Sequence, residues 1–143
     1  MSNLQAALGV AQLERLDEFV AIKRRMGARY TSLLAGTPGI QLPLAQSHQA
    51  DNIYWVYGVV LEDAVPFDAK GAMERLEKLG IGTRPFFWPM HQQPVFRKMG
   101  LFAGEIHPIA ERIARRGFYI PSGLALNHAQ IERSAEAVKE ILR

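Results

Sequence analysis

The segment from Gly82 to His91 limits the local fold more than any other part of this sequence. It reads Gly-Thr-Arg-Pro-Phe-Phe-Trp-Pro-Met-His. Pro85 and Pro89 fix their own φ angles and keep the preceding residues out of the helical region, so we expect an extended, stiff loop. A cation at Arg84, an aromatic wall and an imidazole on such a loop suit a cleft for an anionic, ring-containing ligand. The alternative is the end of a hydrophobic strand with one solvated histidine.

Residues 2–35 are expected to form one long helix. Ser2 is a good N-cap with Gln5 at the reciprocal capping-box position, and glycine and proline at 36–39 end the helix. The second half carries a single apolar stripe, whereas residues 4–13 are apolar nearly all round. A helix of that kind is normally buried on all sides. We therefore expect another part of the protein, or a second subunit, to cover these turns.

The rest of the chain alternates between patterns typical of short strands and of helices. Strands are expected at 52–62, 81–87 and 118–120, and helices at 68–79, 94–99, 108–116 and from 127 onward. The segment 52–62 is apolar on both alternating faces, which is typical of a central strand covered on both sides. This order of elements predicts an α+β fold, with helices packed on a small sheet that we expect to be of the antiparallel type.

Composition narrows the possible partners. The chain has 143 residues, which suits a single domain, and no cysteine, which excludes disulfides and thiolate metal sites. The formal net charge is only +3, and the basic clusters Lys23–Arg25 and Arg112–Arg116 have acids close by. We interpret them as solvated helix faces and expect no nucleic-acid partner. No apolar run is long enough to span a membrane and the start lacks a basic signal-peptide region, so we expect a cytoplasmic protein without membrane association.

The common catalytic and metal-binding patterns are absent. The four histidines share no ligand spacing, and none is paired with a carboxylate at helical spacing, so no metal site is expected. His107 and His128 are expected at the surface. The glycines at 80 and 82 follow a helix, the reverse of the order in dinucleotide-binding folds. Ser122 lacks the Gly-x-Ser-x-Gly context of a nucleophile elbow. No catalytic residue is assigned.

Three blocks of the sequence resemble the DegT/DnrJ/EryC1/StrS aminotransferases. Residues 1–17 are similar to the helix that links the two domains of these enzymes. Residues 80–94, which include the Thr-Arg-Pro-Phe-Phe-Trp-Pro-Met-His run, are similar to a family strand and loop, and residues 110–123 to the next block. The blocks occur in the family's order and the resemblance covers the whole chain. The Arg-Pro-Phe-Phe-aromatic-Pro form is similar to that of perosamine-synthase-like members.

The resemblance implies the small domain of the aspartate aminotransferase fold. Residues 1–35 would be the interdomain linker helix and residues 36–143 the small C-terminal domain. Family members are homodimers that use pyridoxal 5′-phosphate (PLP) to aminate keto-sugars carried on nucleotides, in 4-amino sugar and polysaccharide biosynthesis. Their large N-terminal domain carries the Schiff-base lysine, which none of the five lysines here matches. The resemblance thus implies that this domain is absent, and that the chain alone binds no PLP and is inactive.

On the substrate side, the resemblance places His91 near the sugar nucleotide at the mouth of the active site. Trp88 stands where the family usually has tyrosine, which keeps an aromatic wall and removes a hydroxyl. Arg84 is a candidate for binding the pyrophosphate or for an interdomain contact, and a structural ion pair is the alternative. The expected function is therefore that of a nucleotide-sugar aminotransferase domain. A free-standing interaction or sugar-nucleotide-binding module derived from that domain is the competing hypothesis.

Overall fold

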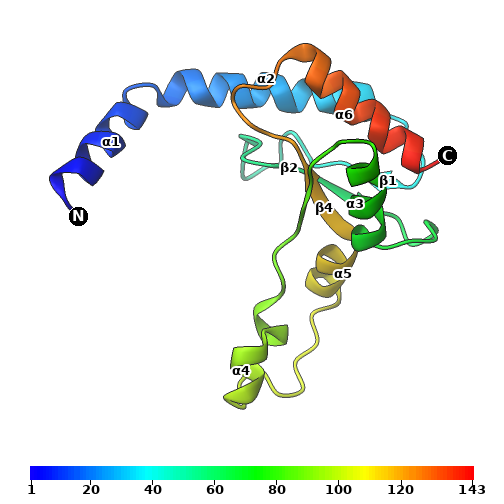
Figure 1. Cartoon of the computed structure of the whole chain (residues 1–143). Helices are drawn as coiled ribbons and strands as arrows, with labels where there is room; N and C mark the ends of the chain where they lie inside the picture. The colour runs from blue at the N-terminus through cyan, green and yellow to red at the C-terminus, as the bar shows by residue number, and fades with distance from the viewer.

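The computed structural model describes residues 1–143, and Figure 1 shows a body of helices on a small sheet with two projecting parts. The helices are α1 (Asn3–Leu13), α2 (Leu16–Leu34), α3 (Ala69–Lys78), the short 3-10 helix η1 (Met90–Gln92), α4 (Pro94–Lys98), α5 (Pro108–Arg116) and α6 (His128–Ile141). The strands are β1 (Ile40–Gln41), β2 (Tyr57–Leu61), β3 (Arg84–Pro85) and β4 (Gly117–Ile120). None of the helices has the length and apolar character needed to cross a lipid bilayer.

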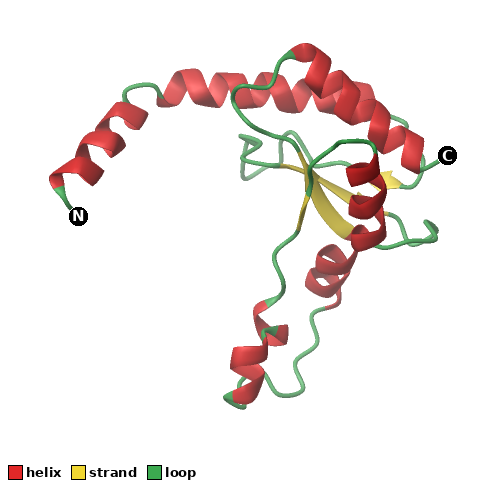
Figure 2. Ribbon diagram, in the orientation of Figure 1, coloured by secondary structure: helices red, strands yellow, loops and turns green.

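The four strands form one antiparallel sheet in the order β1-β2-β4-β3 (Figure 2). In its centre Tyr57 lies opposite Ile120, and Val59 lies opposite Phe118. Because alternate residues of a strand face the same side of the sheet, these four side chains share one face. All four are at most 1% exposed. The expected α+β fold with a small antiparallel sheet is confirmed.

Helices α2, α3 and α6 cover this face of the sheet and complete the core. Leu34 of α2, Leu76 of α3 and Val138 of α6 are fully buried in one cluster with the strand residues. Full burial of a side chain of this size contributes about 1.5–3 kcal/mol. Helices α2 and α6 lie side by side along the top of the body in Figure 1. The apolar side of α6 therefore faces the core.

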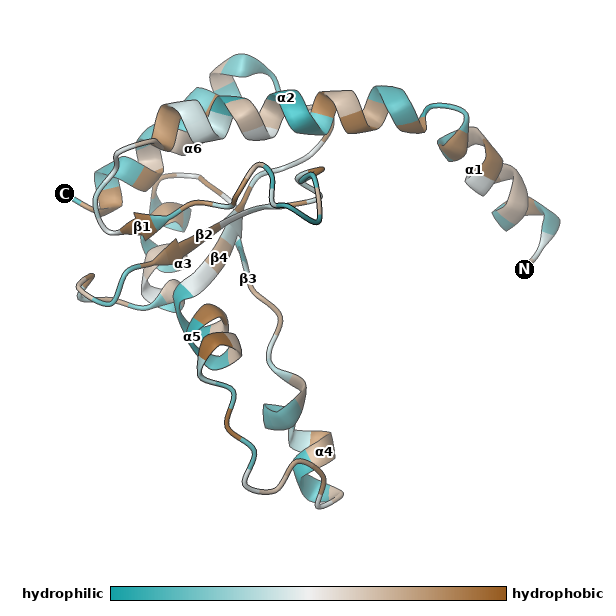
Figure 3. Cartoon of the chain, turned by 180° about the vertical axis from the view of Figure 1, so that it is seen from behind, coloured by the Kyte–Doolittle hydropathy of each residue, from teal (hydrophilic) through white to brown (hydrophobic).

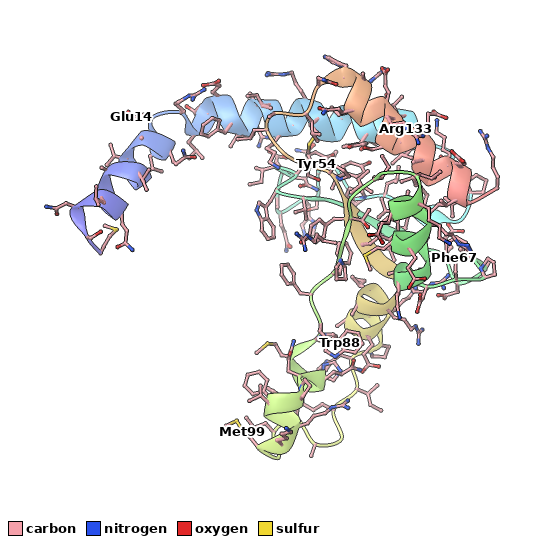
Figure 4. The ribbon with its side chains drawn as sticks, in the orientation of Figure 1. Glu14, Tyr54, Phe67, Trp88, Met99 and Arg133 are labelled. Atoms are coloured by element: carbon pink, nitrogen blue, oxygen red, sulfur yellow. The ribbon has the colours of Figure 1, made fainter.

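The prediction of one helix over residues 2–35 is wrong at Glu14 and Arg15, where the structure separates α1 from α2. Arg15 has φ −114° and ψ 11°, outside the helical region, and its Nε lies 2.9 Å from Oε2 of Glu18 in the first turn of α2. No residue of α1 is buried. Because nothing in the chain holds α1 in line with α2, it turns away from the body at the bend marked by Glu14 in Figure 4.

Strand β2 is shorter than the predicted strand over 52–62 because the chain bends at Tyr54. This residue has a φ of 51°, in the left-handed region that bulky residues rarely adopt. Its ring fills the space left by the missing side chain of Gly27 and stacks on Tyr57, with ring centroids 5.8 Å apart. The expectation that the strand is covered on both faces holds only in part, since Val60 on the opposite face is half-buried.

Strand β3 pairs over two residues rather than the predicted 81–87. Pro85 has no N–H to donate, which is tolerated at the edge of a sheet. After β3, the ring of Phe86 folds over the half-covered face of the sheet, onto Gly58 and Gly117. A Cβ at Gly58 would lie 2.5 Å from the ring, and one at Gly117 would overlap it. Glycine at both positions is what permits this close approach.

Residues 87–107 leave the body as an arm that carries η1 and α4 (Figure 1). Near its tip the rings of Phe96 and Phe102 pack edge to face with centroids 5.7 Å apart. Met99, labelled in Figure 4, is 65% exposed. Figure 3 shows hydrophobic residues along both the arm and α1, and neither segment contributes a residue to the core. Both projections therefore expose apolar surface that this chain leaves uncovered.

The sequence predicts that the basic cluster Arg112–Arg116 is a solvated helix face, but Arg116 is buried. Its guanidinium donates hydrogen bonds to the backbone carbonyl oxygens of Leu61, Glu62, Val65 and Phe67. The hydrogen bond from Nη1 to the carbonyl oxygen of Phe67 is 2.7 Å long. No carboxylate pairs with this cation. The side chain therefore ties the connection between β2 and α3 to the end of α5.

Candidate functional site

Two of the three candidate residues, Arg84 and Trp88, line the same cavity. It has a volume of about 620 Å³ and lies between the start of α3, strand β3 and helix α5. Lys70 of α3, Arg115 of α5 and Tyr119 of β4 also line it. Figure 4 places Trp88 on the arm, between the body and α4. The proline-bounded loop therefore brings a cation and an aromatic side chain to one cavity.

The cavity carries an excess of positive charge. Arg84 and Arg115 form no ion pair, and Lys70 lies 3.9 Å from Glu74 in an exposed pair. Exposed pairs of this kind contribute little to stability and leave the charge available. The one acid in the lining, Asp68, caps α3, where its Oδ1 accepts the N–H of Gly71 at 2.9 Å. A concave site lined mainly by cations attracts anions.

Aromatic rings form the other wall of this cavity. Phe87 and Trp88 are 73% and 54% exposed, so most of their surface is free to contact a ligand. Phe86 and Tyr119 also line the cavity, and their rings stack with centroids 6.4 Å apart. Cationic and aromatic walls together suit a ligand with an anionic group next to a ring.

His91 lies away from this cavity and is buried, with only 7% of its surface exposed. Its Nε2 is 2.8 Å from Oε1 of Glu111 in the first turn of α5. The same carboxylate oxygen accepts the backbone N–H of His107 at 3.1 Å, and the two histidine rings pack edge to face with centroids 4.7 Å apart. We refer to His91, His107 and Glu111 as the clasp, because they join the two ends of the arm.

The contacts of the clasp could not be predicted from local sequence patterns, because His91 and Glu111 are 20 positions apart. His107 is exposed, as the sequence predicts, and its ring also packs on His91. Its Nε2 lies 3.0 Å from Oε2 of Glu105 in an exposed pair. Histidine and acidic side chains do not gather anywhere in groups of three or more that could hold a metal ion. The contacts of the clasp connect η1 to the start of α5.

Hydrogen bonds within the clasp lower the pKa of Glu111. The backbone N–H of His107 has the largest effect, and the side chain of His91 adds to it. A carboxyl whose pKa is lower in the folded state stabilises that state above its unfolded pKa and loses this contribution as the pH falls through its folded pKa. The clasp is therefore expected to weaken in acid, below the ordinary pKa of glutamate.

We expect His91→Ala to loosen the arm while the body stays folded. The substitution removes the bond to Glu111 and empties a buried position, but His91 is not part of the core. Hydrogen exchange measured by mass spectrometry should show about tenfold faster exchange in residues 90–107 and no change in β2 and β4. His48→Ala, at an exposed position, is the control. Unchanged exchange in the arm would show that the clasp does not hold it.

A second cavity, of about 350 Å³, shares Arg84 and Tyr119 with the first. Trp55 and Ser122 also line it. Lys23 of α2 connects the backbone at Trp55 with the backbone at Ser122. Its Nζ donates to the carbonyl oxygen of Trp55 at 2.8 Å and to that of Ser122. Burial lowers the pKa of Lys23. Trp55 was not among the candidate residues, because its place in an apolar alternating segment indicates a packed strand residue.

Comparison with known proteins identifies relatives of this chain. Residues 1–139 match the model of the DegT/DnrJ/EryC1/StrS aminotransferase family. The chain is 33% identical over 143 residues to a GDP-perosamine synthase of Vibrio cholerae, covering 97% of this chain and 37% of that protein. It is 32% identical over 139 residues to a dTDP-4-dehydro-2,3,6-trideoxy-D-glucose 4-aminotransferase of Saccharopolyspora spinosa, covering 94% of this chain and 33% of that protein.

A solved structure shares both the fold and part of the sequence. DesV of S. venezuelae, in complex with a ketimine intermediate, superimposes with a TM-score of 0.80 at 30% identity. The match covers 97% of this chain and 36% of DesV. The chain therefore spans about a third of the length of the relatives it matches. Since the family model covers nearly the whole sequence, the resemblance noted from the three sequence blocks is confirmed: the chain belongs to the DegT/DnrJ/EryC1/StrS aminotransferase family.

Proposed function

We propose that this chain is one part of a larger PLP-dependent enzyme that transfers an amino group to a keto-sugar linked to a nucleotide. The observation that carries this proposal is the family match over residues 1–139. Relatives named as a GDP-perosamine synthase and a dTDP-dehydro-sugar 4-aminotransferase support a nucleotide-linked substrate and a 4-amino sugar product. The cavity lined by Arg84 and Trp88 supports it too, because a nucleotide sugar is anionic and contains rings.

Within that enzyme, residues 36–143 would form the small C-terminal domain, and residues 1–35 would link it to a large N-terminal domain. Two observations support this division. The chain spans about a third of its relatives' length, which leaves room for a larger domain. Helix α1 exposes Leu4, Leu8 and Leu13 to between 68% and 80%, and an apolar helix is normally covered. The proposed assembly is a cytoplasmic homodimer of the complete enzyme.

The residues of this chain do not fit a PLP site of their own. PLP-dependent transamination needs a lysine to form the imine and an acid to pair with the pyridine nitrogen. Lys23 is engaged by two backbone carbonyl oxygens, and the other four lysines lie on helices α3, α4 and α6. Of these, Lys70 alone lines a cavity described above, and it is 81% exposed beside Glu74. We infer that the large domain supplies the lysine and the acid, and that the chain alone is inactive.

On the substrate side, we propose that Arg84 faces the diphosphate of the nucleotide sugar and that Trp88 forms part of the aromatic wall beside it. His91 is proposed to lie near the sugar nucleotide at the mouth of the active site, outside the cavity lined by Arg84 and Trp88. Its burial and its bond to Glu111 favour a role in fixing the direction of the loop that carries Trp88.

The test compares residues 1–143 with the protein encoded by the complete reading frame that contains them. Both are supplied with PLP, an amino-acid donor and 4-keto-sugars linked to GDP or dTDP. We expect amination, and an imine absorbance that borohydride removes, from the longer protein alone. The proposal fails if the longer reading frame encodes no lysine-bearing domain, or if its product aminates none of these substrates.

A further inference from the structure

Trp55 and Phe87 form a pair of parallel, exposed aromatic rings outside the core. Trp55 precedes β2 and Phe87 begins the arm, so the pair joins two distant segments. The ring planes are 2° apart in angle and the centroids lie 6.2 Å from each other. The two side chains are 64% and 73% exposed. Large aromatic side chains that gather in the open mark a surface that binds something.

Several contacts fix the backbone so that Trp55 points outward. The preceding Tyr54 has a φ of 51°, and its ring is buried in the hollow at Gly27. The N–H of Tyr54 donates to Oδ1 of Asn52 at 2.7 Å, and the carbonyl oxygen of Trp55 accepts from Lys23. A left-handed conformation at a bulky residue persists only where the surroundings over-determine it, and such strain gathers at binding sites. The exposed indole is therefore held in place by its neighbours.

Arg84 connects this ring pair to the cationic cavity. It lines the 350 Å³ cavity together with Trp55 and the 620 Å³ cavity together with Phe87. Arg84 forms no ion pair, so its guanidinium is free to bind an anion. One molecule with an anionic group at Arg84 and a planar ring nearby can therefore reach both features.

We propose that the Trp55–Phe87 pair is a stacking platform for the base of a nucleotide whose diphosphate lies at Arg84. The inference rests on the proposed function, and it assigns the base to two residues to which the family resemblance gives no role. Every nucleobase presents a flat π face, so stacking accepts purines and pyrimidines alike, and it typically raises affinity by about tenfold or more for each base. The platform fixes where the base lies, and Arg84 fixes where the diphosphate lies.

The experiment follows the indole N–H signals of Trp55 and Trp88 by NMR in the chain of residues 1–143. The chain is titrated with guanosine diphosphate, thymidine diphosphate and inorganic pyrophosphate. We expect both nucleotides to shift the Trp55 signal with dissociation constants of about 1 mM, and pyrophosphate to leave that signal unchanged. Trp88→Phe assigns the two indole signals.

Substitutions separate the platform from the anion site. Trp55→Ala should weaken nucleotide binding about tenfold and leave pyrophosphate binding unchanged, while Trp55→Phe retains most of the affinity. Arg84→Gln should weaken the binding of all three ligands. The matched controls are Ile53→Ala, at an exposed apolar position on the same loop, and Arg24→Gln, at an exposed cation on α2. Neither control should change the binding of nucleotides or of pyrophosphate.

Three results would overturn the inference. The first is no shift at about 10 mM nucleotide, and the second is an equal effect of Trp55→Ala on nucleotide and pyrophosphate. The third is a change in oligomeric state caused by Trp55→Ala while nucleotide binding stays the same. That result would show that the Trp55–Phe87 pair makes a protein–protein contact. The amination assay of the longer protein is independent of these titrations. If the longer protein is active but nucleotides do not bind at Trp55 and Phe87, the stacking platform is contradicted and the proposed function is not.

Discussion

Arg116→Ala is expected to lower the free energy of unfolding by about 3 kcal/mol or more. Arg116 is 8% exposed, and its guanidinium donates to four backbone carbonyl oxygens in residues 61–67. A hydrogen bond from a charged donor contributes about 1.5–3 kcal/mol, and alanine would remove the donor that these four oxygens share. Urea unfolding followed by circular dichroism measures the change. Since small domains are stable by only about 5–15 kcal/mol, the loss is a large fraction of the total.

Two further variants make the Arg116 result interpretable. Arg115→Ala changes the neighbouring cation on the same helix, which is exposed and forms no ion pair, so the effect should stay within about 0.5 kcal/mol. Arg116→Lys keeps the charge but cannot present five donors in a fork, and it should give an intermediate loss. The lysine variant also supplies a value if the alanine variant does not fold. A loss below about 1 kcal/mol for alanine would show that the carbonyl oxygens find other donors.

The chain of residues 1–143 is expected to self-associate through α1, and Leu4→Glu combined with Leu8→Glu should convert it to a soluble monomer. The two leucines are 80% and 70% exposed, and no residue of α1 is buried. Exposed apolar surface of this extent favours association in water. Two added carboxylates remove that gain and add repulsion between copies. Sedimentation velocity over a range of protein concentrations measures the change.

Leu44→Glu is the matched control for the helix variant. Leu44 is 75% exposed, as the α1 leucines are, but it lies on the body. Its substitution should leave the self-association unchanged, because the proposed contact is made by α1. A monomer at high concentration for the unaltered chain would contradict the idea that α1 needs a covering partner.

Local signals predicted most helices correctly because caps act within a few residues. Asp68 and Asn127 cap α3 and α6 through side-chain bonds to backbone N–H groups three positions on, as their sequence context indicates. The break at Glu14 could not be predicted in the same way. Whether α1 continues α2 depends on what α1 rests against, and the sequence of the helix itself does not contain that information.

The candidate site was predictable where one short segment carries it. Arg84 and Trp88 reach the same cavity because Pro85 keeps the loop between them extended. Trp55 and the clasp depend on contacts between distant segments, which no local pattern reveals. Arg116 was taken for a solvated cation because its partners are backbone carbonyl oxygens, which look the same at every position of a sequence. Whether the site residues bind substrate stays a prediction.

The attachment of the arm has a consequence for how such a protein can change. The clasp joins His91 to His107 through Glu111, so the stretch between them is a loop with two fixed ends. Phe86, packed on Gly58 and Gly117, fixes the start of the arm on the sheet. Doubling the length of a loop with fixed ends costs only about 0.6 kcal/mol in closure entropy. Insertions and substitutions at the tip therefore leave the body nearly as stable as before. The tip of the arm can thus acquire new contact surfaces with little loss of stability, provided that the two glycines and the clasp are kept.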